Sequence, residues 1–244
     1  MKPYLYTQMA ALETSHWWFV GRRRILTIVL STFTDLPSQC NILEVGCGTG
    51  GNLGMLSQFG QVYALEPNEK ALELADQKGN FDIRKGSLPN DIPFDIQTFD
   101  LIAALDILEH ISEDFECLTT FRNLLRPNGW LLLTVPAFPF LWSTHDDDHH
   151  HKRRYNKANL QHIVQEAGFS QVMVTYFNTL LFPLAVSLRL INKTLHLKGF
   201  NGEVALPATL NTVLTGIFAS ERHVIKHCSL PVGLSLLLLA KKAS

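Results

Sequence analysis

A glycine-rich turn between two short apolar runs is the feature that most constrains how this 244-residue chain can fold. Residues 41–45 (Asn-Ile-Leu-Glu-Val) precede the turn at residues 46–50 (Gly-Cys-Gly-Thr-Gly), and residues 62–66 (Val-Tyr-Ala-Leu-Glu) follow it. The pattern predicts a strand, a tight loop, a helix and a second strand. Glu44 and Glu66 stand near the ends of the two strands, where a ligand can reach them.

The glycines alone do not specify the nucleotide, because three of them fit the G-x-G-x-x-G dinucleotide fingerprint: Gly46, Gly48 and Gly51. A pyrophosphate at a helix N-terminus is stabilised by backbone N–H groups, and the nearby carboxylate of Glu44 would repel it. S-adenosylmethionine (SAM) carries an ammonium and a sulfonium, which Glu44 would attract. Glu66 suits either cofactor, since a carboxylate ending the second strand accepts hydrogen bonds from ribose hydroxyls. Glu44 therefore favours SAM over a nicotinamide dinucleotide.

Four segments between about residue 40 and residue 137 resemble the class I SAM-dependent methyltransferases in order and spacing. They read E-V-G-C-G-T-G, A-L-E-P, F-D-L-I-A-A-L-D-I-L-E-H and N-G-W-L-L-L-T-V-P. The resemblance implies a Rossmann-like α/β fold with helices on both faces of a seven-stranded, mostly parallel sheet. The last strand is then antiparallel, in a hairpin with its predecessor, and a helical cap is inserted before it. The implied activity is methyl transfer from SAM to a small-molecule or lipid- or glycan-linked acceptor, on oxygen, leaving S-adenosylhomocysteine.

The resemblance also implies a cofactor site. Glu44 contacts the methionine end of SAM, Glu66 binds the ribose hydroxyls, and Asp106 meets the amino-acid portion unless it serves as a helix N-cap. Relatives often have an Asp where this chain has Ser87, whose hydroxyl can still bond the adenine amino group. The expected cofactor-binding residues are Glu44, Gly46, Cys47, Gly48, Gly50, Glu66, Pro67, Ser87, Leu88, Asp106, Ile107, Trp18 and Arg23.

The N-terminal string at residues 13–23 (Glu-Thr-Ser-His-Trp-Trp-Phe-Val-Gly-Arg-Arg) resembles the entry segment of a bacterial methyltransferase subfamily. There a helix lies across the SAM pocket as a lid. The aromatic residues would close the pocket, and Arg22 or Arg23 would pair with the cofactor carboxylate. The alternative is a helix whose aromatic side chains pack on the core and whose arginines lie in solvent.

Two histidines are candidate catalytic residues, His110 and His145. His110 follows the fourth predicted strand and is able to accept a proton from a substrate hydroxyl. The alternative is a ring that packs over the cofactor and positions it. Methyl transfer is an in-line displacement at an activated carbon, so alignment and exclusion of water supply much of the acceleration, and a base is optional.

Residues 143–155 are dense in His and Asp and invite a metal hypothesis, because imidazole and carboxylate are ligands for zinc and iron. Consecutive residues cannot easily wrap one ion, and no second cluster completes a site, so no metal is expected. Relatives show H-D, a short gap and H-x-R-R-Y, which indicates a loop that binds the acceptor or that is simply structural. The expected acceptor-binding residues are His145, Asp146, His151, Arg153, Arg154 and Tyr155.

Hydrophobic periodicity predicts alternating strands and helices. Strands are expected at 41–45, 62–66, 81–84, 99–105, 130–135, 169–177 and 233–240, and helices at 7–34, 52–60, 68–79, 113–125 and 156–167, with a loop at 138–155. One domain, residues 1–244, is expected, with lid helices at 1–37, a SAM-binding core at 38–137, an acceptor loop, helix and strand at 138–177, an apolar helical cap at 178–228 and a closing strand at 229–244.

Bulk properties narrow the partners. The net charge of −1 gives no electrostatic case for nucleic acid, and four scattered cysteines without a C-x-x-C pair are typical of reduced, cytoplasmic proteins. Residues 178–215 begin with an apolar stretch at 179–188, and Arg189, Lys193 and Lys198 follow it. This segment fits a cap packed on the sheet. It also fits a peripheral contact with the inner membrane face. A NAD(P)-dependent oxidoreductase and a non-catalytic SAM-binding regulatory protein are the alternative functions.

Overall fold

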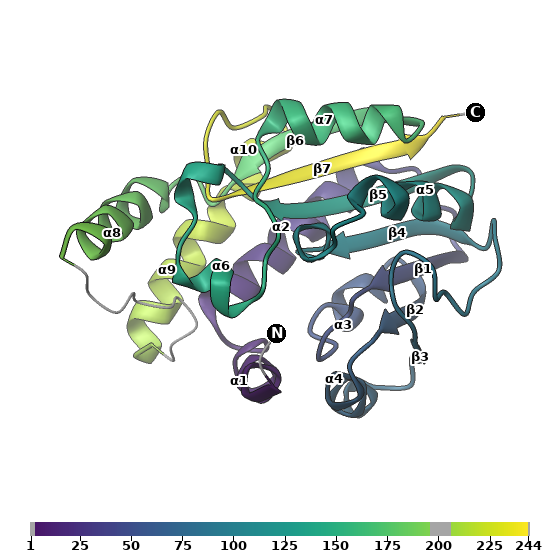
Figure 1. Ribbon diagram of the computed structural model, residues 1–244, viewed down its shortest axis with the longest axis horizontal. Helices are drawn as coiled ribbons and strands as arrows, with labels where there is room; N and C mark the ends of the chain where they lie inside the picture. Colours follow the sequence, from purple (N-terminus) through teal and green to yellow (C-terminus); the bar gives the residue numbers. More distant parts are fainter. Residues whose placement is uncertain (1–2, 196–205, 244) are drawn as a thin grey trace.

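The computed structural model describes residues 3–195 and 206–243. Over these residues seven strands form one sheet in the order β3-β2-β1-β4-β5-β7-β6 (Figure 1). β7 pairs antiparallel with β5 and β6, and the other neighbouring strands are parallel. The strands are β1 (Cys40–Val45), β2 (Gly60–Glu66), β3 (Asp82–Lys85), β4 (Phe99–Leu105), β5 (Leu125–Pro136), β6 (Phe169–Phe177) and β7 (Ser235–Lys242). The predicted mixed sheet with an antiparallel last strand is confirmed.

Helices cover both faces of the sheet because alternate strand residues point to opposite sides. In β4, Ile102 and Ala104 belong to the core beneath α5 (Asp114–Leu124) and α7 (Lys157–Glu166). Leu101 and Ala103 belong to the core on the other face. That second core is covered by α2 (Trp17–Phe33), α3 (Leu53–Leu56), α4 (Glu69–Ala75), α9 (Ala208–Ser220) and α10 (Arg222–Ile225).

The N-terminal segment forms two helices, so the single helix expected over residues 7–34 is wrong. α1 (Pro3–Leu12) ends before Glu13, and α2 begins at Trp17. Glu13 is buried in the break, where its carboxylate accepts a hydrogen bond from Thr49 at 2.6 Å. Asn211 of α9 accepts a hydrogen bond from the Trp17 backbone N–H at 2.8 Å, which gives α2 its N-terminal cap. Tertiary contacts therefore decide where the helix is interrupted.

Two other expected elements differ in extent. The helix after the glycine turn is only α3, because β2 already begins at Gly60, where a Cβ would lie 2.3 Å from the carbonyl oxygen of Cys40. The expected loop at residues 138–155 contains a short helix, α6 (Thr144–Asp148). A capping box between Ser143 and Asp146 stabilises its N-terminus. The helix expected from residue 68 is present as α4, and the Asn68 side chain caps it by accepting from the Ala71 N–H at 3.1 Å.

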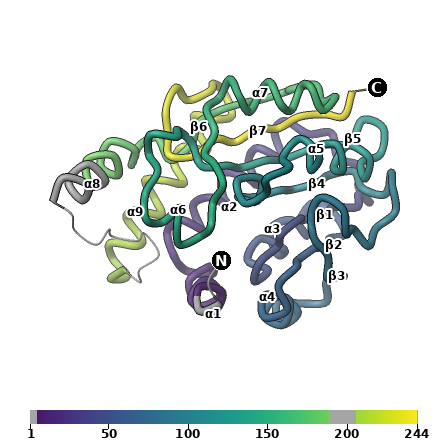
Figure 2. The backbone as a smooth tube through the Cα atoms, in the orientation of Figure 1, coloured from purple at the N-terminus to yellow at the C-terminus, as the bar shows by residue number. Residues whose placement is uncertain are grey.

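The apolar cap contains α8 (Phe182–Leu195), α9 and α10, while Lys198 lies outside the described residues. α9 runs beside α2 (Figure 2). Phe218 of α9 stacks on Trp18 with ring centroids 5.1 Å apart and is fully buried. α8 extends away from the sheet at the side where α1 and α6 also lie (Figure 1). No helix among the described residues has the length and apolar character needed to span a membrane.

Candidate active site

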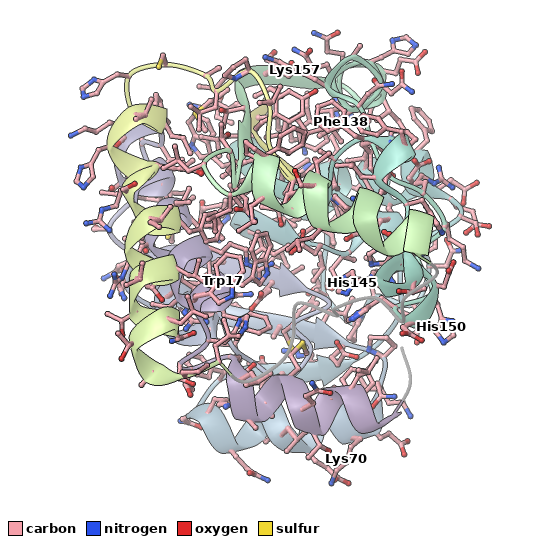
Figure 3. The ribbon with its side chains drawn as sticks, turned by 90° about the vertical axis from the view of Figure 1, so that its left-hand side faces the viewer. Trp17, Lys70, Phe138, His145, His150 and Lys157 are labelled. Atoms are coloured by element: carbon pink, nitrogen blue, oxygen red, sulfur yellow. The ribbon has the colours of Figure 1, made fainter. Side chains whose placement is uncertain are left out.

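A cavity of about 1010 Å³ opens at the carboxyl edge of the parallel strands. Gly46, Glu66, Asp106 and Pro136, which follow or end β1, β2, β4 and β5, all contribute to its wall. Ligands of open α/β sheets bind at this edge. Figure 3 looks onto it and shows Trp17 and His145 on opposite sides of the opening.

The glycine turn brings bare backbone to the cavity. Gly46 and Gly48 have φ angles of +66° and +55°, a region that disfavours residues with a Cβ. A Cβ on Gly46 would lie 2.2 Å from Cδ1 of Ile107, so the turn also requires glycine for packing. Gly46, Cys47 and Gly48 line the cavity, whereas Gly50 lies outside the lining formed by the described residues and shapes the turn instead.

Glu66 ends β2 with its carboxylate fixed at the cavity wall. One oxygen accepts from the Gly48 N–H at 2.9 Å and the other from the Asn68 N–H at 3.0 Å. Burial raises the pKa of Glu66, and the two backbone hydrogen bonds partly offset that rise. The carboxylate is thus held in one orientation, as a group that binds a diol must be.

Glu44 lies behind the wall. Its side chain is 1% exposed and accepts a hydrogen bond from Asn52 at 2.8 Å, while its Oε2 has no hydrogen-bond partner among the described residues. Burial raises the pKa of Glu44 to about 7. Asn52 and Arg22, which face the cavity, are its polar neighbours. The carboxylate of Glu44, which favoured SAM in the sequence, is therefore separated from the cavity by the side chains of Asn52 and Arg22.

Arg22, and not the expected Arg23, reaches the cavity. Arg22 forms a short ion pair with Asp106 and its Nη2 lies 3.5 Å from Oδ1 of Asn52. Its Nε is buried without a hydrogen-bond partner among the described residues. Arg23 instead donates to the carbonyl oxygens of Gly51 and Glu13, at 3.2 and 2.6 Å. The expected contact of Arg23 with the cofactor is therefore corrected. This side chain instead joins α2 to Glu13 and to the glycine turn.

Asp106 occupies the position expected from the sequence. It has a φ of +60°, which is strained for a residue with a side chain, and accepts a hydrogen bond from Thr134 at 3.0 Å. The short 3₁₀ turn that follows begins after Ile107, so Asp106 is not its N-cap. The other expected cofactor-binding residues that line the cavity are Pro67, Ser87, Leu88, Ile107 and Trp18.

The N-terminal helices α1 and α2 are tied to the glycine turn through Glu13, which lies between them and was not among the predicted site residues. Besides Thr49, its carboxylate pairs with Lys78 at 2.5 Å. A Cβ on Gly51 would lie 2.5 Å from the same carboxylate. The only sequence signal for this role is an isolated acid before the aromatic run, and that signal is too weak to have predicted the contact.

The His-Asp loop is held together by a buried ion pair. Asp146 is 0% exposed and accepts from Arg154 at 2.7 and 3.0 Å and from the Ser143 N–H at 2.8 Å. Nδ1 of His151 lies 2.9 Å from the same carboxylate. Although burial acts to raise it, the hydrogen bonds from His151 and Arg154 hold the pKa of Asp146 well below its ordinary value. Asp146 therefore orients the loop.

Three of the six expected acceptor-binding residues line the cavity: His145, His151 and Arg154. The other three, Asp146, Arg153 and Tyr155, are not in the lining that the described residues form. Arg153 and Tyr155 both bond to Asp114 at the start of α5, at 2.5 and 2.8 Å. The expectation that these three residues touch the acceptor is corrected, because their partners lie within the protein and fix the loop.

His110 faces the cavity beside His151, with ring centroids 4.7 Å apart. Burial, with the neighbouring His151 and His149, lowers the pKa of His110 to about 3. An imidazole that is so weakly basic is a poor proton acceptor. The alternative, a ring that positions ligands, therefore fits the geometry better. Glu109, buried next to it, was not identified as a site residue from the sequence.

Charged groups of both signs lie close together around Arg22, which lines the cavity and pairs with Asp106. Arg22 Nε and, behind the wall, Glu44 Oε2 are buried polar atoms without partners among the described residues. Buried polar groups of folded proteins are nearly always satisfied, so this end of the cavity suits a ligand that carries both charges. The fold and this pocket together define a Rossmann-like protein with a ligand cavity at the carboxyl edge of its sheet.

A family model described as methyltransferase domain matches residues 18–174. A mitochondrial ubiquinone biosynthesis O-methyltransferase of Schizosaccharomyces pombe is 26% identical over 140 residues, which cover 49% of this chain and 50% of that protein. The chain thus spans about half the length of this relative. The chain belongs to the methyltransferase domain family. Membership of this family favours the prediction of a SAM-dependent methyltransferase over that of a NAD(P)-dependent oxidoreductase.

Solved structures share the fold. A SAM-dependent methyltransferase from Mesorhizobium loti aligns with a TM-score of 0.59 at 14% identity, covering 88% of this chain and 96% of that one. Phosphoethanolamine N-methyltransferase 2 of Haemonchus contortus, in complex with S-adenosyl-L-methionine, aligns with a TM-score of 0.59 at 16% identity, covering 90% and 52%. At these identities the likeness supports the Rossmann-like architecture and carries no information on the acceptor.

Proposed function

We propose that this enzyme methylates a hydroxyl oxygen on an apolar or aromatic small molecule. The observation that carries the proposal is the composition of the cavity wall beyond the cofactor residues. Imidazoles of His110, His145 and His151 share this wall with apolar and aromatic side chains: Ile111, Phe140, Leu141 and Trp142. Such a wall suits a flat or apolar body that carries a polar atom.

Oxygen as the target is supported from two directions. The relative from S. pombe is named an O-methyltransferase, and the match covers 49% of this chain. The segment after β4 reads Asp-Ile-Leu-Glu, at residues 106–109, without an Asn-Pro-Pro-Tyr-like tetrapeptide that would suit amide or nucleobase nitrogen. Both points favour a hydroxyl acceptor over a nitrogen acceptor.

The proposed cofactor contacts use the charged groups in the cavity wall and Glu44 behind it. Arg22 binds the SAM carboxylate, Glu44 and Asp106 attract the ammonium, and Glu66 accepts bonds from the ribose hydroxyls. The backbone of Gly46 and Gly48 lies along the cofactor. When bound, SAM supplies a methyl group activated by its positive sulfur. The Arg22–Asp106 ion pair then opens far enough for the ligand's carboxylate to share Arg22.

The acceptor oxygen forms a bond to the methyl carbon as the carbon–sulfur bond breaks, and the hydroxyl proton leaves to solvent. The residues of the cavity contribute by alignment and by exclusion of water, which are large terms for an in-line displacement. His110 and His145 position the acceptor, with the ring of His110 kept neutral by burial. Trp18, stacked on Phe177 and Phe218, holds the lid helix over the site.

Matched acceptors test the target atom. Purified enzyme with methyl-labelled SAM is incubated with pairs that share one aromatic skeleton and differ only in a hydroxyl or an amine. We expect label in the hydroxyl member of a pair, bound as an ether. Label in the amine members, with none in the hydroxyl members, would disprove the choice of oxygen while leaving the methyltransferase assignment intact.

We further propose that the acceptor reaches the site from a membrane surface. Val186 of α8 lines the cavity, and large apolar side chains on α8, α9 and the turn before α8 are exposed: Leu180, Leu184, Leu188, Leu210, Val213 and Ile217. An apolar surface next to a cavity suits uptake of a lipid-linked acceptor.

Liposome sedimentation tests this surface. We expect the enzyme to sediment with vesicles and Leu184→Glu to abolish binding. Val172→Glu is the matched control, because Val172 is 49% exposed on β6, away from α8 and α9. Absence of wild-type binding at low salt, or equal loss in both variants, would contradict the proposal.

A further inference from the structure

Two chain segments that are distant in the sequence bring a group of metal-ligating side chains together. Glu109 and His110 come from the 3₁₀ turn after β4, and His151 follows α6. One ligand atom from each of the three residues lies within 4.8 Å of the other two. All three residues line the cavity. The second cluster that the sequence seemed to lack is therefore present at residues 109–110, well before the His-Asp run.

The imidazole of His151 is oriented by a hydrogen bond on one ring nitrogen. Its Nδ1 lies 2.9 Å from Asp146, which leaves Nε2 for a ligand. Asp146 is itself fixed by the two hydrogen bonds from Arg154. The ring of His110 packs edge-on against that of His151, with centroids 4.7 Å apart. A histidine that binds a metal typically donates its other ring N–H to a carboxylate or a backbone carbonyl, and the contact between His151 and Asp146 is of this kind.

The carboxylate of Glu109 is the incomplete part of this cluster. Glu109 is 1% exposed, and its Oε2 has no hydrogen-bond partner among the described residues. Leaving a buried polar group unpaired costs about 1–3 kcal/mol, and more for a charged one. A cation bound between the carboxylate and the two imidazoles would satisfy this oxygen. The orphaned atom therefore points to a ligand at the same place as the paired rings.

We propose that Glu109, His110 and His151 bind a divalent transition-metal ion of the zinc class. Two imidazoles and one carboxylate form the protein ligand set of many catalytic zinc sites, which keep a further position open. That position would face the cavity. In a use that rests on the proposed O-methylation, an acceptor hydroxyl would occupy it, lose its proton to solvent more readily and present an oxyanion to the methyl group.

Metal binding can be measured without cofactor or acceptor. The full chain is stripped with chelator, freed of chelator and titrated calorimetrically with ZnCl2, and Co²⁺ is added separately to follow its visible absorption. We expect one ion per chain with a Kd of about 1 μM or tighter. Glu109→Gln and His151→Ala should each weaken binding by about 100-fold or more. Co²⁺ should show the intense bands of a low-coordinate site, which the variants lose.

His150→Asn is the matched control, since His150 belongs to the same run but lies at the periphery in Figure 3 and is exposed. Its φ of +57° is tolerated by Asn. Binding of S-adenosylhomocysteine and the circular dichroism spectrum report whether each variant is folded. A wild-type Kd weaker than 1 μM, or folded Gln and Ala variants that keep the affinity, would overturn the site. Methyl transfer by the stripped enzyme would then still support the proposed function.

Discussion

Replacing Glu44 with Gln tests the proposed donor site through its pH dependence. Glu44 is buried, and burial raises its pKa to about 7. In our proposal the ammonium of the cofactor needs the ionised carboxylate. Each pH unit below the pKa then costs about 1.4 kcal/mol of binding free energy, because Glu44 must first lose its proton. At pH 5.5 the cost is about 2 kcal/mol, or roughly a 30-fold loss of affinity.

The measurement is calorimetric titration with S-adenosylhomocysteine, which keeps the ammonium and carboxylate of SAM. For the wild type we expect the Kd to fall about 30-fold between pH 5.5 and 8, about half of that factor by pH 7, and to level off above pH 8. The direction follows from the sign of the shift, since raising the pH ionises Glu44. Glu44→Gln cannot titrate at this position, so its affinity should be lower at pH 8 and independent of pH.

Glu66→Gln is the control, because burial raises the pKa of Glu66 as well. It should weaken binding through the lost ribose hydrogen bonds and yet retain the wild-type slope below pH 7. If Glu44→Gln kept that slope, another group would be responsible. A flat wild-type profile would refute the argument that Glu44 must ionise when the cofactor binds.

Three further predictions concern stability and the glycine turn. In the ligand-free enzyme Glu44 contributes stability below its ordinary pKa of 4.5 that is lost as the pH rises through about 7, because the folded state retains the proton. In urea titrations between pH 4.5 and 8, the free energy of unfolding should decline by about 3 kcal/mol less in Glu44→Gln than in the wild type. Arg154→Leu leaves Asp146 buried without its cation and should lower the free energy of unfolding by about 3–5 kcal/mol, whereas Lys70→Leu, which breaks the exposed pair with Glu73, should cost less than about 1 kcal/mol. Gly46→Ala should abolish binding of S-adenosylhomocysteine, because its Cβ meets Ile107, and Ile107→Ala should restore little, since the positive φ remains strained.

The sequence predicts the parts of the molecule that depend on local pattern. Apolar runs of strand length and the glycine turn predict the central strands. The predicted helix starts at Asn68 and Asn156 are also correct, and each of these side chains accepts from an N–H three residues on. The break in the N-terminal helix could not be predicted this way. Nothing local marks Glu13 as the partner of Thr49 and Lys78, because both lie more than thirty residues further along the chain.

The choice between Arg22 and Arg23 shows the same limit. Adjacent helical residues point about 100° apart, so one of them faces the sheet edge and the other does not. Which one does depends on how α2 is rotated, and that rotation is set by packing against α9 through Trp18 and Phe218. The composition of the helix does not say which arginine reaches the cavity, and packing against the partner helix places Arg22 there.

The His-Asp run misled for a related reason. Neighbouring residues of the run point in different directions once the chain turns. Asp146 faces inward to Arg154, while His150 is exposed. The residues that complete a cluster with His151 are Glu109 and His110, in the 3₁₀ turn after β4. Glu44 and Glu109 each keep a buried oxygen without a partner among the described residues, which is a cost to folding. Unsatisfied groups of this kind persist in proteins where function requires them. In our proposals ligands offset this cost, the cofactor ammonium at Glu44 and the cation at Glu109.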